Sequence, residues 1–162
     1  MEFTTADLCD QFAGQIQLVE PLFQEFGGVP RFAGPIETVH VYEDNTLVRE
    51  LLGSKGGGRV LVVDGGGSLR CALVGDRLGT LARENGWAGI LVNGCVRDSA
   101  ELRRIPIGIR ALNVSPLRSS KNGSGRRGEP VSFAGVSFSP GGFLYADSDG
   151  IIFSHESLLP QT

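Results

Sequence analysis

Two short segments of the chain combine residues that could bind an anion and a metal ion. Gly75, Asp76 and Arg77 open a segment with helical periodicity, and twenty residues separate Asp76 from the pair Arg97-Asp98. The unpaired N–H groups at the start of a helix attract anions. A carboxylate suits a hard divalent cation, and a guanidinium suits a carboxylate or a developing oxyanion. These residues could therefore support metal-assisted chemistry on an anionic substrate.

A structural interpretation of the same residues is equally open at this point. Asp76 could simply complement the positive end of a helix, and Arg97 could form a surface ion pair with Asp98. Histidine chemistry has almost no support, because His40 and His155 lie far apart in the sequence and have no companion residues. A histidine-based zinc site or a Ser-His-Asp triad is therefore not expected.

The elements that would position these residues alternate between strands and helices. Apolar runs of strand length are separated by segments with helical spacing, which indicates parallel βαβ units with right-handed crossovers. In such a unit the start of the helix and the end of the following strand lie at the same edge of the sheet. Asp76, Arg97 and Asp98 should therefore converge. The predicted elements are a strand at 59–64, a helix at about 75–84, a strand at 88–92, a short helix through 102 and a strand at 107–114.

Strands and short helices are also predicted on both sides of this centre, and together they make a mixed α/β sandwich or barrel-like fold. No internal repeat or long linker divides the sequence, so we expect a single domain over residues 1–162. The flanking elements are a helix capped by Thr4 or Thr5 and ending at Gly14, strands at 16–20 and 38–42, a helix from Asn45 to Gly53, a strand at 131–138, and a hairpin at 143–154 around Asp149-Gly150.

Composition narrows the functional classes. The 162 residues are 41% hydrophobic and carry a net charge of −3, which argues against direct, charge-driven binding of nucleic acid or of an anionic membrane. The basic loop from Lys121 to Arg127 is interpreted as solvated. Neither a signal peptide nor an apolar run near the ~18 residues of a membrane span is present. Together with three scattered cysteines, interpreted as reduced core thiols, this predicts a cytoplasmic protein.

Two other motifs are interpreted as turns. Gly65-Gly66-Gly67 follows a predicted strand, but the third glycine of a dinucleotide fingerprint would fall at Arg70. The run from Asp147 to Gly150 lacks the ligand spacing of a calcium loop. We therefore expect neither a nucleotide site nor a calcium site.

Several separated motifs, in order along the chain, resemble the RraA-like family, which contains regulators of ribonuclease E activity and class II 4-hydroxy-4-methyl-2-oxoglutarate aldolases. The resemblance runs from about Thr5 to about Phe153 and implies a swivelling β/β/α domain with mixed sheets. It also implies a homotrimer, or a hexamer of two trimers, with sites at subunit boundaries. The motifs are Thr5–Asp10, Glu43-Asp44-Asn45, Val60–Arg70 and Gly94–Asp98.

The aldolase members of this family carry an aspartate, twenty intervening residues and then Arg-Asp, and Asp76, Arg97 and Asp98 match this pattern. By resemblance, Asp98 would bind Mg²⁺ or Mn²⁺, directly or through waters. Arg97 would hold the keto oxygen of the substrate, and Asp76 would position a water that moves the proton. The residues Gly75, Asp76, Arg77 and Leu78 would complete the substrate pocket.

The resemblance therefore predicts a lyase that cleaves 4-hydroxy-4-methyl-2-oxoglutarate to pyruvate. The same site would decarboxylate oxaloacetate, because both reactions pass through a pyruvate enolate stabilised by the metal and Arg97. One alternative is a non-catalytic regulator that binds and inhibits ribonuclease E. A third interpretation, methyl transfer in quinone biosynthesis, needs a nucleotide-type cofactor site, which the glycine spacing argues against. For the subunit contacts of the trimer we expect the apolar segment Phe32–Ile36 to be suitable.

Overall fold

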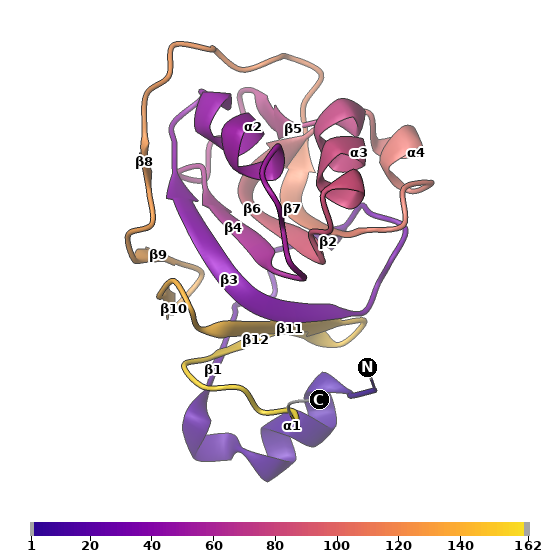
Figure 1. Ribbon diagram of the computed structural model, residues 1–162, viewed down its shortest axis with the longest axis vertical. Coiled ribbons are helices and arrows are strands. Elements are labelled where there is room, and N and C mark those ends of the chain that lie inside the picture. The colour runs from indigo at the N-terminus through magenta and orange to yellow at the C-terminus, as the bar shows by residue number, and fades with distance from the viewer. Residues whose placement is uncertain (1, 161–162) are drawn as a thin grey trace.

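The computed structural model describes residues 2–160, which form one large mixed sheet with helices at both ends of the molecule (Figure 1). The helices are α1 (Thr5–Gln11), the 3-10 turn η1 (Ala13–Gln15), α2 (Thr46–Leu52), α3 (Asp76–Glu84) and α4 (Ser99–Leu102). The strands are β1 (Ile16–Leu18), β2 (Gln24–Glu25), β3 (Phe32–His40), β4 (Val60–Asp64), β5 (Ala72–Val74), β6 (Gly89–Val96), β7 (Gly108–Val114), β8 (Arg126–Arg127), β9 (Val131–Phe133), β10 (Val136–Phe138), β11 (Phe143–Asp147) and β12 (Gly150–Ser154).

The long strand β3 joins two halves of the sheet that differ in direction. The strand order is β1-β12-β11-β3-β4-β6-β7-β2, with β5 added beside β6 and β8 beside β3. The first part of β3 pairs antiparallel with β11, and the second part pairs parallel with β4. Strands β4, β6 and β7 continue in parallel. The predicted α/β fold with βαβ units is confirmed.

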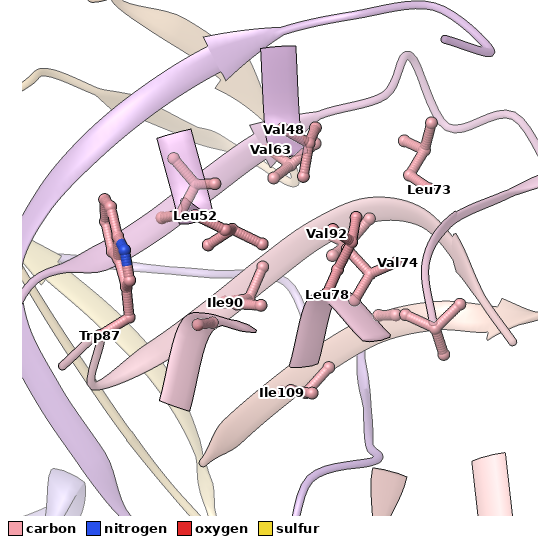
Figure 2. Close-up of a cluster of buried hydrophobic side chains, with 14 of the residues drawn as sticks. Val48, Leu52, Val63, Leu73, Val74, Leu78, Trp87, Ile90, Val92 and Ile109 are labelled. Carbon is pink, nitrogen blue, oxygen red and sulfur yellow. The ribbon is translucent and has the colours of Figure 1, made fainter. Parts of the chain in front are cut away.

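Side-chain alternation along the parallel strands fills a core on each face of the sheet. In β4, Leu61 and Val63 point to the helical face, whereas Val60 and Val62 point to the opposite face. Figure 2 shows the helical core, in which Val48 and Leu52 of α2 and Leu78 of α3 pack over Val63, Ile90, Val92 and Ile109. The opposite core contains the β9–β10 hairpin and one face of β11 and β12.

Helix α1 covers the remaining face of the antiparallel half, where Leu8 packs against Tyr145 and Ile152. Its N-cap is Thr4, whose hydroxyl accepts a hydrogen bond from the Asp7 N–H, as the sequence predicts for a capping threonine. The two ends of the described chain lie close together beside this helix (Figure 1). The cavity described below lies in the other half of the molecule, so α1 takes no part in it.

Three local predictions are wrong for identifiable reasons. The segment 131–138 is two strands, because Ala134 and Gly135 adopt positive φ angles of 50° and 77° and turn the chain back on itself. Strand β6 runs on to Val96 rather than turning at Gly94, because the unpredicted strand β5 pairs with it. The proposed subunit-contact segment Phe32–Ile36 is the first part of β3, whose large side chains are buried in the chain's own cores.

The remaining chain-wide observations concern membrane segments and cysteines. In the described part of the chain, no helix is long and apolar enough to cross a membrane. Cys71 and Cys95 are buried and Cys9 is partly buried, and all three are free thiols. Burial raises the pKa of each of these thiols, which is consistent with inert packing residues.

Candidate active site

A cavity of about 480 Å³ lies at the carboxyl end of the parallel strands, beside the N-terminus of α3. The predicted site residues, from Gly75 to Leu78 together with Arg97 and Asp98, all line it. Topology explains this convergence, because α3 begins at the edge of the sheet where β6 ends. The other lining residues are Asn45, Arg49, Ala72, Leu73, Val74, Leu81, Arg118, Ser119 and Lys121.

The back of the cavity is part of the helical core. Leu73 and Val74 of β5 and Leu78 of α3 line the cavity and also belong to the buried cluster shown in Figure 2. The polar residues from Gly75 to Arg77 are therefore attached to a close-packed strand and helix. Such a base holds their backbone positions fixed, as a binding site requires.

Asp98 is held in an unusual conformation at the end of β6. Its φ and ψ angles are 59° and 42°, in the left-handed region that residues other than glycine rarely adopt. The preceding Arg97 is fixed by its backbone N–H, which donates to the Val74 carbonyl at 2.9 Å. The Asp98 carbonyl accepts from Leu102 N–H at 2.9 Å and so begins α4. Backbone strain at a cavity-lining carboxylate is typical of functional sites.

The carboxylate of Asp98 contacts the start of α3 directly. Its Oδ2 accepts a hydrogen bond from the Asp76 backbone N–H at 3.0 Å. Gly75, the N-cap residue, makes this approach possible, because a Cβ atom there would stand 2.7 Å from Asp98 Oδ2 and 3.2 Å from Arg97 Cγ. A side chain at position 75 would therefore push the Asp98 carboxylate away from the Asp76 N–H.

Asp76 and Asp98 interact as a pair of carboxyl groups. A hydrogen bond to Asp98, followed by burial and by the repulsion of the second carboxylate, raises the pKa of Asp76. The hydrogen bond from the Asp76 N–H is the main cause that lowers the pKa of Asp98, with help from Arg97 and Arg77. Without a cation between them, two neighbouring carboxylates retain a proton more readily than an isolated carboxylate would. This is the behaviour of a donor set suited to a cation.

The cavity carries much more positive charge than the rest of the protein. Five cationic side chains line it against two carboxylates, although the net charge of the whole chain is −3. Among residues 2–160, no carboxylate lies within 4.0 Å of any of these five cations. In particular, Arg97 and Asp98 do not form the surface ion pair that the structural interpretation of the sequence required. The five cations are Arg49, Arg77, Arg97, Arg118 and Lys121.

The donor set fits a magnesium-type ion better than an all-protein metal cage. Asp76 and Asp98 supply carboxylate oxygens, but within the described residues no cluster of three or more His, Cys, Asp or Glu side chains could hold a metal. Mg²⁺ usually keeps several waters and binds through one or two carboxylates together with substrate oxygens. The residues present are compatible with that ion.

Sequence reasoning missed one wall of the cavity. The basic loop is exposed, as the sequence predicts, but its Lys121 also lines the cavity with Arg118 and Ser119, which the sequence did not indicate. Arg126 and Arg127 do remain at the surface, in weak pairs with Glu129 and Glu50. The only signal for this wall was the motif 43–45, whose Asn45 accepts a hydrogen bond from Lys121 Nζ at 3.1 Å.

The motifs interpreted as turns lie outside the cavity. Gly66 and Gly67 adopt positive φ angles, and the Gly67 N–H donates to Asn93 O at 3.1 Å in a tight turn. Asp147 ends β11 at the predicted hairpin, and its paired register with Gly150 places Ser148 and Asp149 in the turn. Both histidines are solvent-exposed. None of these residues lines the cavity.

Comparison with known proteins assigns the fold and much of the sequence to one family. The RraA-like family, described as Aldolase/RraA, matches residues 5–153. A relative from Laribacter hongkongensis, named "Putative 4-hydroxy-4-methyl-2-oxoglutarate aldolase", is 58% identical over 98% of this chain and 100% of its own length.

Two solved structures are also similar over nearly their whole length. One is described as the S-adenosylmethionine:2-dimethylmenaquinone methyltransferase of Geobacillus kaustophilus, with 49% identity, a TM-score of 0.96, and 99% of both chains covered. The other is the RNA-processing inhibitor RraA of Thermus thermophilus, with 47% identity, a TM-score of 0.94, and 99% and 96% of the two chains covered. The three names describe different activities, so the choice between these activities has to be argued from the residues of the site.

Proposed function

Because this chain belongs to the RraA-like family, we propose that it is a class II aldolase, a divalent-metal-dependent lyase that cleaves 4-hydroxy-4-methyl-2-oxoglutarate to pyruvate. We propose that it also decarboxylates oxaloacetate, because the loss of CO₂ leaves the same pyruvyl fragment. One observation carries the proposal: Asp76, Arg97 and Asp98 line a single cavity at the N-terminus of α3. The name of the relative from Laribacter hongkongensis supports the same activity.

The proposed cofactor is Mg²⁺ or Mn²⁺, held by Asp98 directly or through waters, with Asp76 beside it. When bound, the ion would supply Lewis acidity toward the carboxylate and keto oxygens of the substrate. The Asp98 side chain is exposed and uses only one oxygen in its hydrogen bond to the Asp76 N–H, so it has lone pairs to offer. The close approach of the Asp76 carboxyl adds negative charge where the cation would lie.

Arg97 would stabilise the charge that develops during bond cleavage. As the C3–C4 bond breaks, its electron pair moves onto the C2 oxygen and the C4 hydroxyl becomes a carbonyl by losing its proton. Arg97 has no carboxylate partner within the described residues, so its guanidinium is free to donate to the C2 oxygen. Donors aimed at a developing oxyanion are among the largest contributors to catalysis.

The remaining residues would bind the substrate and move the proton. Asp76, whose pKa is raised by its hydrogen bond to Asp98, would hold the water that takes the C4 hydroxyl proton and returns a proton to C3. The first turn of α3, from Gly75 to Leu78, presents the positive end of a helix to the substrate carboxylate. Arg77 adds a further cation to that wall of the cavity.

The direct test is pyruvate release from 4-hydroxy-4-methyl-2-oxoglutarate and from oxaloacetate, with and without a chelator. We expect both reactions to stop when the metal is removed and to return when Mg²⁺ or Mn²⁺ is added. Asp98→Ala should lose metal affinity and most activity while keeping the native fold, because its side chain is exposed, although the left-handed backbone at this position should lower the melting temperature somewhat. Full activity of Asp98→Ala at low metal concentration would refute the assignment of Asp98.

A second candidate function is binding and inhibition of ribonuclease E, which is favoured by the similarity to the Thermus thermophilus RNA-processing inhibitor. A cytoplasmic location, as expected from the sequence, would allow it. Binding would occur through protein contacts, because the net charge of −3 does not favour direct binding of nucleic acid. Immobilised ribonuclease E separates the two functions: a regulator should be retained equally well as wild type and as Asp98→Ala. Loss of retention in the absence of RNA would contradict this candidate.

Methyl transfer, the activity in the name of the Geobacillus kaustophilus protein, receives less support. A nucleotide-type cofactor needs a phosphate- or ribose-binding turn next to the reacting centre. The glycine turn at 65–67 does not line the cavity. Addition of S-adenosylmethionine is therefore expected to leave no methylated quinone product.

We propose that the protein is a homotrimer, which could double to a hexamer, and that the contact lies beside the cavity. Four large apolar side chains are exposed at or beyond the carboxyl ends of the parallel strands, the edge on which the cavity opens. A neighbouring subunit at this edge would cover them and could contribute to the site. Light scattering should therefore give a trimer or hexamer mass, and Leu117→Asp should shift it toward monomer. The four residues are Tyr42, Leu69, Val114 and Leu117.

A further inference from the structure

The loop that follows β7 forms one wall of the cavity, although it has almost no regular secondary structure. It supplies Arg118, Ser119 and Lys121. Two backbone contacts fasten it: the Ala72 N–H donates to Leu117 O at 2.7 Å, and the Ser120 N–H donates to Glu43 O at 2.8 Å. The position of this wall therefore depends on the segment that leads into α2.

Asp44 clamps the same loop to the beginning of α2. Its side chain is buried, with 1% of its surface exposed. Oδ1 accepts from the Thr46 N–H at 2.9 Å, and Oδ2 accepts from the Asn122 N–H at 2.6 Å and from Ser124 Oγ at 3.4 Å. A carboxylate that accepts from residues on both segments holds them together with charge-assisted hydrogen bonds.

Asn45 extends this connection into the cavity. Its Nδ2 donates to the Leu73 carbonyl at 3.1 Å, and its Oδ1 accepts from Lys121 Nζ at 3.1 Å. Because the amide nitrogen is committed to a carbonyl, the amide oxygen must face the ammonium group. Leu73 belongs to β5, which leads directly to Gly75 and Asp76. Asn45 therefore links Lys121 to the strand that positions the carboxyl pair.

The choice of a neutral partner for Lys121 matters for binding. An ammonium group has three donors, and Asn45 occupies one of them. No carboxylate among residues 2–160 lies within 4.0 Å of Lys121 Nζ. An amide oxygen orients the ammonium without neutralising it, whereas a carboxylate at the same place would cancel its charge. Two donors and a full positive charge are thus left for an anion in the cavity.

We propose that Asn45 is a positioning residue that holds the Lys121 ammonium in the cavity with its charge available to a substrate carboxylate, and that Asp44 keeps the supporting loop in place. The proposal rests on the proposed function in one respect, because it takes the ligand to be an anionic 2-keto acid. Its distinctive consequence is that the effect of Asn45 on binding passes through Lys121.

A double-mutant cycle tests this consequence. On 4-hydroxy-4-methyl-2-oxoglutarate, Lys121→Met should raise KM by about 10- to 100-fold, the effect of losing a charged hydrogen-bond donor. Asn45→Ala should raise KM by about 5- to 20-fold with a much smaller change in kcat, because the lost interaction is uniform binding. The double variant should bind no worse than Lys121→Met alone. Independent, multiplicative losses would overturn the proposal.

Asn45→Asp separates orientation from simple tethering. A carboxylate at position 45 would still attract the Lys121 ammonium but would neutralise it, so KM should rise at least as far as in Asn45→Ala. A wild-type KM for Asn45→Asp would show that only the tether matters and would overturn the proposal.

Asn85→Ala is the matched control. Asn85 Nδ2 also donates to main-chain carbonyls, those of Leu52 and Leu81, both at 3.0 Å, but it lies outside the cavity. Its loss should lower the melting temperature and leave KM unchanged. If Asn85→Ala raises KM as much as Asn45→Ala does, the effect of Asn45 is general destabilisation and the proposal fails.

A binding measurement distinguishes failure of this proposal from failure of the proposed function. The cycle is repeated by calorimetry with oxalate and Mg²⁺, since oxalate has the oxygen arrangement of the carboxylate and keto groups of pyruvate. If the wild type releases no pyruvate, but the losses of oxalate affinity in the two single variants and the double variant are non-additive as predicted, the proposed function fails and the role of Asn45 stands. If pyruvate is released but the cycle is additive, the role of Asn45 fails alone. If the wild type neither releases pyruvate nor binds oxalate, the proposed function and the role of Asn45 both fail.

Discussion

Two regions of the molecule place an arginine near an aspartate and a helix N-terminus, and they use these residues differently. Around Asp147, Oδ2 accepts from the Thr5 N–H at 2.7 Å, and Oδ1 accepts from Thr5 Oγ1 at 2.7 Å and from the Asp149 N–H at 3.0 Å. The buried Arg110 donates through Nη2 to Glu25 Oε1 and to the carbonyls of Pro30 and Asp147. These contacts join α1, β7 and β11.

The region of Asp98 leaves most of its bonding capacity unused. The hydrogen bonds of the Asp98 carboxylate involve only Asp76, through its backbone N–H and its carboxyl group, and the Asp98 side chain is exposed. Arg97 has no carboxylate partner in the described part of the chain. The residue types are the same in the two regions, so the difference lies in the unused donors and acceptors. A polar group that is fully satisfied stabilises the fold, and one that is not can bind a ligand.

The largest expected effect is a loss of catalytic rate on replacing Arg97, the arginine that, unlike Arg110, has no carboxylate partner among residues 2–160. Arg97→Ala should reduce kcat on oxaloacetate by about 100- to 1,000-fold, or about 3–4 kcal/mol, with a smaller change in KM, because the interaction strengthens as charge develops. Arg97→Lys should not restore the rate fully, since an ammonium cannot reproduce the planar fork of the guanidinium. Steady-state kinetics of both variants provide the measurement. A kcat near the wild-type value for Arg97→Ala would mean that Arg97 is a surface residue.

The converse substitution, at Asp147, should lower the free energy of unfolding and leave kcat nearly unchanged. Asp147→Ala leaves the buried Thr5 N–H and hydroxyl without their acceptor, which should lower the free energy of unfolding by about 2–3 kcal/mol. Urea denaturation measures this loss, and kcat is measured at a temperature where the variant is folded. We expect kcat to remain within about twofold of wild type, because Asp147 is not part of the cavity. A large fall in kcat with an unchanged free energy of unfolding would contradict the structural role of Asp147.

The buried carboxylates of Asp44 and Asp147 should also make the free energy of unfolding depend on pH. Burial would raise the pKa of Asp44, but hydrogen bonds from Thr46, Asn122 and Ser124 outweigh it and lower the pKa from 3.8 to about 2. Hydrogen bonds from Thr5, Asp149 and Gly150 likewise lower the pKa of Asp147 against the effect of burial. A carboxyl with a depressed folded-state pKa stabilises the protein above its unfolded pKa, and this contribution disappears as the pH falls through the folded pKa.

For Asp44 this stabilisation amounts to about 2 kcal/mol at neutral pH. Urea denaturation should show constant stability from this source above about pH 5 and a loss of that size between pH 4 and pH 2. Asp44→Asn should be less stable than wild type at pH 7 and should approach it at pH 2. Parallel curves for the two proteins over this range would contradict the assignment.

The smallest expected effect concerns two glycines. In Gly75→Ala the new Cβ would stand 2.7 Å from Asp98 Oδ2, so the carboxylate must move away from the Asp76 N–H. We expect about a tenfold loss of kcat/KM from this displacement. Gly14→Ala is the control, because nothing lies within 4 Å of its Cβ position and its φ angle is not positive. Equal kinetics for the two variants would show that the close approach at Gly75 is not required.

The sequence was a good guide to the central strands and to the meeting of Asp76, Arg97 and Asp98. Parallel strands joined by right-handed crossovers bring helix starts and strand ends to one edge, and this rule depends only on the order of the elements. It was a poor guide to short strands. The three-residue strand β5 has no alternation long enough to detect, yet its pairing with β6 changes where Arg97 leaves the sheet.

The wall of the cavity formed by the loop after β7 could not be predicted from local sequence patterns. Lys121 lies in a glycine-rich loop without periodicity, and 75 residues separate it from Asn45, its partner in the fold. Local sequence determined the types of the elements, because side-chain alternation and helix caps act over a few residues. Only the tertiary structure decided which polar groups are satisfied, because that depends on contacts between segments far apart in the chain. For this reason Asp147 and Asp98, indistinguishable as residues, become a structural carboxylate and a candidate metal ligand.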